Sequence, residues 1–157
     1  MKLKQLALFF LLALMASKSM GNTSKDICNS LKPEVSVLQE QLPIRIDYVT
    51  SLIGVQAIYL SSTCLINYNY LVDTEVYVKD VSKHAGLTME ESIEWLKTDE
   101  AYASMKENFT VVATGAVDST MTELKKYKGI KILFNYSFDD LSITPVIATG
   151  FDSTGEK

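Results

Sequence analysis

The sequence predicts an α+β fold: a single four-stranded antiparallel sheet, made of two hairpins, packed against an N-terminal helix and a long, broken central helix. Two patterns lead to this prediction. Apolar residues recur every three or four positions before Pro43 and after Thr88, which is typical of helices that bury one side. Elsewhere apolar and polar residues alternate, which is typical of strands. A chain of 157 residues has room for one domain with a core, which we expect to span residues 22–157.

The first 21 residues differ from the rest and predict a signal peptide. Lys2 and Lys4 precede the apolar segment 6–15, and small residues follow at Ser19 and Gly21. The apolar segment is too short to cross a bilayer. We therefore expect cleavage after Gly21, with cleavage after Ser19 as the alternative, and a protein exported to the periplasm or the medium, with no membrane span.

Export changes how the two cysteines are interpreted. Cys28 and Cys64 are the only cysteines of the chain, and both lie beyond the signal. An oxidising compartment favours a disulfide between them, and two buried free thiols are the alternative. His84 is the only histidine, so we expect no metal site.

The N-terminal helix is predicted over residues 24–42. Ile27, Leu31, Val35 and Leu38 follow one another at steps of four, four and three residues and form one apolar stripe. Pro33 lies inside this segment, where it lacks a backbone donor, so we expect a kink or a restart there.

The first hairpin is predicted over residues 44–78, with a bulge at Gly54 and a turn at residues 61–63. On the returning strand, alternate residues should face the core, with Tyr68 and Tyr70 among them. The residues between them should share the opposite face. These are Leu65, Asn67, Asn69 and Leu71.

The central helix should start at Thr88, because Thr88 and Glu91 have the spacing of a capping box. Residues 79–87 before it are predicted to be a polar loop. We place a break between about Phe109 and Asp118, because this stretch contains β-branched residues and Gly115.

The second hairpin is predicted from strands over residues 130–138 and 141–149, joined by a turn at Asp139 and Asp140. Pro145 has no N–H group to donate to a neighbouring strand, so the last strand should lie at an edge of the sheet.

The residues that could carry chemistry do not form a recognisable catalytic pattern. His84 lies in a polar segment without an associated nucleophile. Asp139 and Asp140 could form an acid pair, but turns favour the same residues. An acidic group at the start of the central helix fits a solvated helix face better than a calcium site. It comprises Glu90, Glu91, Glu94, Asp99 and Glu100. We expect no enzyme, no catalytic residue and no cofactor.

Charge and the unlike faces of the first hairpin define the expected function. Loss of three lysines with the signal would change the net charge from −4 to −7, which disfavours nucleic acid as a partner. Leucines with intervening amides suit a protein interface. We therefore expect an exported, non-catalytic binding or accessory protein, such as an adaptor, inhibitor or immunity-type protein, which binds a protein partner through Leu65, Asn67, Asn69 and Leu71. The alternative is a small-ligand or enzymatic pocket between sheet and helix, opened by the expected helix break.

Overall fold

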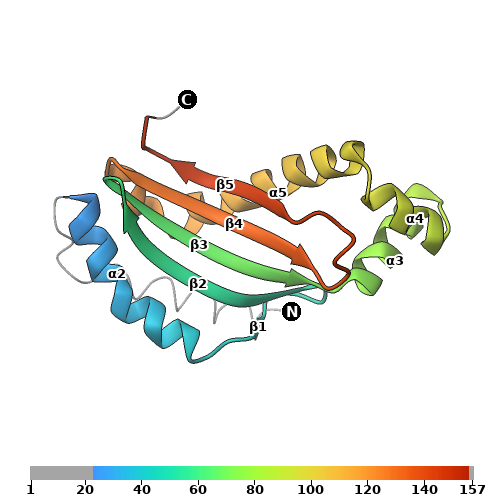
Figure 1. Ribbon diagram of the computed structural model, residues 1–157, viewed down its shortest axis with the longest axis horizontal. Helices are drawn as coiled ribbons and strands as arrows, with labels where there is room; N and C mark the ends of the chain where they lie inside the picture. The colour runs from blue at the N-terminus through green and yellow to red at the C-terminus, as the bar shows by residue number, and fades with distance from the viewer. Residues whose placement is uncertain (1–22, 156–157) are drawn as a thin grey trace.

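A computed structural model of the chain describes residues 23–155 (Figure 1). The expected signal peptide therefore lies outside the described residues. The described part is α+β, as predicted. Its elements are α2 (Ser24–Gln39), β1 (Ile44–Arg45), β2 (Thr50–Leu60), β3 (Thr63–Val72), α3 (Thr74–Ala85), α4 (Met89–Leu96), α5 (Asp99–Thr120), the 3-10 helix η2 (Thr122–Lys126), β4 (Ile130–Phe138) and β5 (Val146–Asp152).

Within residues 23–155 the sheet has five strands in the order β1-β2-β3-β4-β5, not the predicted four. The pairs β2–β3 and β4–β5 are antiparallel, as the two predicted hairpins require. The prediction of a wholly antiparallel sheet is wrong, because β3 and β4 are parallel neighbours. The helical segment between them carries the chain back to the starting end of β3, so β4 runs in the same direction.

The first hairpin is shorter than predicted. It has the expected bulge, since the register shifts between Leu52 and Gly54. However, β3 ends at Val72, and residues 74–85 form the helix α3 instead of a strand end and a loop. The side chain of Asp73 accepts a hydrogen bond from the Val76 N–H, and Gly86 ends the helix in the left-handed conformation.

The central helix is broken, but not where we expected. The capping box at Thr88 and Glu91 is present and starts α4. The helix is interrupted at Lys97 and Thr98, and the Thr98 side chain then caps the N-terminus of α5. α5 continues to Thr120 through the β-branched stretch, so a break between residues 109 and 118 is wrong. Packing against β5 outweighs the weak helix propensity of that stretch.

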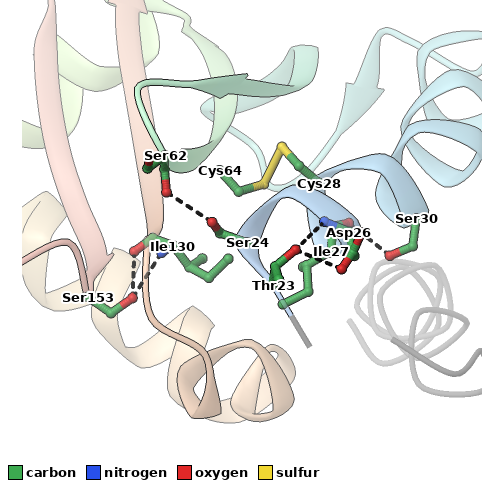
Figure 2. The surroundings of a disulfide bond; sticks show 10 residues. All are labelled: Thr23, Ser24, Asp26, Ile27, Cys28, Ser30, Ser62, Cys64, Ile130 and Ser153. Atoms are coloured by element: carbon green, nitrogen blue, oxygen red, sulfur yellow. Dashed lines mark hydrogen bonds between the residues drawn. A yellow bond between two sulfur atoms is a disulfide. The ribbon is translucent and has the colours of Figure 1, made fainter. Parts of the chain in front are cut away.

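The N-terminal helix is continuous through Pro33, so the expected restart is also wrong. It packs on β2 and β3. The predicted disulfide joins Cys28 in α2 to Cys64 at the start of β3 (Figure 2). Beside it, the Ser24 hydroxyl donates a 2.9 Å hydrogen bond to the Ser62 carbonyl in the turn between β2 and β3.

Both long helices cover the same face of the sheet. α2 is bonded to Cys64, and α5 lies behind β4 and β5 in Figure 1. Phe109 of α5 stacks on Tyr136 of β4 at 4.2 Å between ring centroids. The alternate strand residues beneath these helices are buried, among them Val55, Ile66 and Ile132. The last strand is shifted relative to the prediction of 141–149, because β5 covers Val146–Asp152; it forms an edge of the sheet after Pro145, as predicted.

Candidate functional site

The sheet face opposite α2 and α5 holds the four predicted binding residues, and we call it the open face. β2 and β3 place Gln56 opposite Asn67 and Ile58 opposite Leu65. β4 and β5 continue the same face, because side chains alternate along each strand. The open face includes Ser51, Gly54, Gln56, Ile58, Leu65, Asn67, Asn69, Leu71, Lys131, Leu133, Asn135, Ser137, Ile147, Thr149 and Asp152.

Side-chain amides occupy the middle of the open face. Asn69 of β3 faces Asn135 of β4, whose Nδ2 donates a 2.9 Å hydrogen bond to Asn69 Oδ1. The Oδ1 atom of Asn67 is shielded from solvent and has no hydrogen-bond partner within residues 23–155. Gly54 lies beside Asn69, and a Cβ atom at that position would come within 3.0 Å of Asn69 Nδ2. The glycine therefore gives the amide room.

Aliphatic side chains surround these amides and are exposed to solvent. Ile58 is 45% exposed and Ile147 is 51% exposed, on opposite sides of the face. Leu71 is also exposed, whereas Leu65 and Leu133 are half-buried. The combination is a mixed surface of apolar and hydrogen-bonding groups.

The open face has almost no charge. β2 and β3 contain no charged residue, β4 contains only Lys131, and β5 contains only Asp152. These two form an ion pair at 2.8 Å. Burial opposes ionisation of Asp152, but hydrogen bonds from Lys131 and Thr154 outweigh it and lower its pKa to about 2. Protein interfaces are likewise depleted of charge at their centres.

The covered face carries a row of stacked aromatic rings on β3 and β4. Tyr70 stacks on Tyr136 at 5.1 Å, and Tyr68 stacks on Phe134 at 5.3 Å. The three tyrosines are buried, as predicted for Tyr68 and Tyr70, with exposed fractions of 9% or less. Burial raises all three pKa values, and that of Tyr136 reaches about 12. The phenols therefore stay neutral at physiological pH.

The expected pocket at a helix break has no counterpart at residues 109–118. α5 is continuous there and lies directly against β5. A Cβ atom on Gly150 would come within 2.7 Å of Phe134 and 2.9 Å of Val117. This close packing leaves no room for a ligand beside Gly150.

A shallow cleft of about 440 Å³ lies instead where α3 and α4 meet the end of β4. The sequence analysis does not predict this cleft, because it expects a strand end and a loop where the structure has α3. Its floor includes Val78 and Ile93, and its rim includes Asp139 and Asp140. The Asp139 carboxylate accepts a 2.9 Å hydrogen bond from the Thr74 N–H and so caps α3.

The two aspartates are held in structural roles. Hydrogen bonds from Thr74 lower the pKa of Asp139, and hydrogen bonds from Ser142 lower that of Asp140. Neither carboxyl is set up to keep a proton at neutral pH, as the acid of a hydrolase pair must. The hydrogen bonds of both aspartates therefore fit ordinary turn residues better than an acid pair.

The remaining candidate residues are exposed. His84 lies in the last turn of α3, where its Nδ1 is 2.7 Å from the Asp80 carbonyl oxygen. Glu91 completes the capping box, which lowers its pKa. Within residues 23–155, no three His, Cys, Asp or Glu side chains are arranged to hold a metal ion.

Comparison of the chain with protein-family models, with characterised proteins and with solved structures gives no significant match. Within the described residues, none of the helices combines the length and the apolar character needed to cross a membrane.

Proposed function

We propose that this chain is an exported, non-catalytic binding or accessory protein that holds a protein partner against its open face. The observation that carries the proposal is the near absence of charge on an exposed sheet face of an acidic chain. Aliphatic side chains exposed around central amides give such a face both contact area and hydrogen-bonding specificity. The partner surface that fits it is uncharged and carries aliphatic and hydrogen-bonding side chains.

Two further observations support the proposal. Both long helices, α2 and α5, lie on the other face, so neither of them covers the open face. The disulfide between Cys28 and Cys64 is compatible with an oxidising compartment outside the cytoplasm.

The experiment is affinity capture from envelope and culture-medium fractions of the source cells. The wild-type protein is compared with the double variant Asn67→Arg/Asn69→Arg, which places two cations on the open face. The matched control is Val111→Arg/Val112→Arg, which adds the same charge to exposed positions of α5. Thermal melts followed by circular dichroism establish that all three proteins are folded.

The expected result is one dominant protein that is captured by the wild type and the control and lost with the open-face variant. Capture of the same proteins by all three would rule out the open face as the binding surface. Capture of nothing by a folded wild-type protein would instead favour a small ligand, and the cleft beside α3 is then the place to look.

A further inference from the structure

The two edges of the sheet are not protected equally. At the β2 edge, β1 pairs with Leu52 and Ser51, and the Gln39 side chain of α2 donates a 2.8 Å hydrogen bond to the Val55 carbonyl. At the other edge, β5 pairs with β4 on its inner side only. No other described strand lies beyond it.

The backbone groups that point outward from β5 belong to Ile147 and Thr149. The Ser153 N–H donates a 2.9 Å hydrogen bond to the Ile130 carbonyl, so Ile130 directs its backbone toward the last strand. Alternation along an antiparallel ladder then directs Phe134 toward Ala148. Ile147 and Thr149 lie in the intervening positions, and no hydrogen bond within residues 23–155 joins their backbones to an outer group.

This edge lacks charged residues that would discourage pairing. Residues 141–151 contain no charged residue, and the Ile147 side chain is half exposed. Natural edge strands are usually blunted by lysines, prolines or bulges. Here Pro145 and the register shift near Gly150 limit the free edge to residues 146–149. The edge therefore offers a short, defined ladder of donors and acceptors.

We propose that the outer edge of β5 binds an extended segment of a partner protein, which adds a strand beside Ile147 and Thr149. Only an extended backbone matches a ladder of alternating N–H and C=O groups. The net charge of −4 makes a second copy of this chain a poor occupant and favours a basic segment. The inference does not rest on the proposed function, because it uses the outward backbone groups of β5, whereas the open face would bind its partner through side chains.

The test uses a synthetic basic strand peptide, acetyl-Lys-Val-Thr-Val-Thr-Val-Lys-amide, labelled with a fluorophore. Its matched control carries N-methyl groups at alternate residues, which remove the donors on one edge. Anisotropy measures binding to the purified protein, and NMR measures amide exchange. The expected result is binding of the unmethylated peptide alone, with exchange at Ile147 and Thr149 slowed by at least about tenfold.

Three variants locate the contact. Ile147→Lys and Thr149→Pro should each abolish binding, the first by charge and the second by loss of the outward N–H. Ile58→Lys adds the same charge on the opposite side of the open face and should not affect binding. The Asn67→Arg/Asn69→Arg variant should also still bind, which separates this site from the amides at the centre of the open face.

Three outcomes would overturn the proposal. The first is a peptide that does not bind the folded wild-type protein. The second is slow exchange at both Ile147 and Thr149 in the free monomer, since the edge would then already be paired. The third is a dimer in sedimentation that Ile147→Lys dissociates, because a second copy would then occupy the edge.

Discussion

Asn69 accepts a 2.9 Å hydrogen bond from the side chain of Asn135, across a parallel strand pair and a separation of 66 residues in the sequence. The bond lies on the open face, between the two central strands. It fixes the orientation of both amides, and so defines which donors and acceptors the face presents.

Replacement of Asn135 by alanine should lower the free energy of unfolding by about 1 kcal/mol. The hydrogen bond is half-buried, and its loss leaves the Asn69 side-chain oxygen without this donor. Urea unfolding measures the effect. In a double-mutant cycle with Asn69→Ala, the two losses should be less than additive. Full additivity would mean that the bond does not stabilise the fold.

Gly150 is expected to tolerate no side chain. Gly150→Ala should destabilise the protein by about 1–3 kcal/mol, because the added methyl group would lie 2.7 Å from Phe134 and 2.9 Å from Val117. Thermal unfolding measures the loss. Adding Val117→Ala should recover part of it, although Val117→Ala alone leaves a void in the buried contact. If the double variant is less stable than the sum of the single losses implies, the contact is not the cause.

The sequence contained enough to assign the faces of β3 but not its neighbours. The alternation from Cys64 to Val72 identified the buried and open residues, because side-chain period depends only on the local backbone. The parallel pairing of Asn69 with Asn135 depends on where residues 74–126 return the chain. Alternation in β3 gave no sign of it, since strands in parallel sheets are usually buried on both faces.

Two other predictions are wrong because capping residues at helix ends decide the structure there. Residues 73–78 are not the end of a strand as predicted, because Asp73 before Glu75 and Gly86 thirteen residues later are the start and stop signals of α3. The helix break was placed among β-branched residues, although Thr98 before Asp99 has the pattern of an N-cap. The cleft beside α3 could not be predicted once that helix was missed.

The disulfide should contribute substantially to stability. It closes a loop between residues 36 positions apart, and both cysteines are fully buried. Cys28→Ala/Cys64→Ala should lower the free energy of unfolding by about 4 kcal/mol in the chain-entropy description. Urea unfolding of the variant should match that of the wild type in reductant. If reductant left the urea midpoint of the wild-type protein unchanged, the expectation would be wrong.

Acid should weaken the ion pair between Lys131 and Asp152. The pKa of Asp152 is about 2 in the fold, below the value of about 4 in an unfolded chain. Its ionised form therefore stabilises the fold above about pH 4, and this contribution is lost as the pH falls toward 2. The stability difference between wild type and Asp152→Asn should narrow over this range in urea unfolding curves. A difference that stays constant with pH would exclude a role for the carboxylate charge. The stability difference between wild type and Lys131→Met should also narrow as the pH falls toward 2.

The position of the parallel pair has a consequence for the order of folding. The Cys28–Cys64 loop, with α2, β2 and the start of β3, lies entirely before the crossover helices in the chain. The disulfide and the contacts of α2 with β2 and β3 therefore involve only residues that precede α3 in the chain. The pairing of β3 with β4 must wait until α3, α4 and α5 are complete, and closing so long a loop is slow. Until then one edge of β3 is unpaired, and a chain that emerges N-terminus first exposes that strand to other chains before β4 is available.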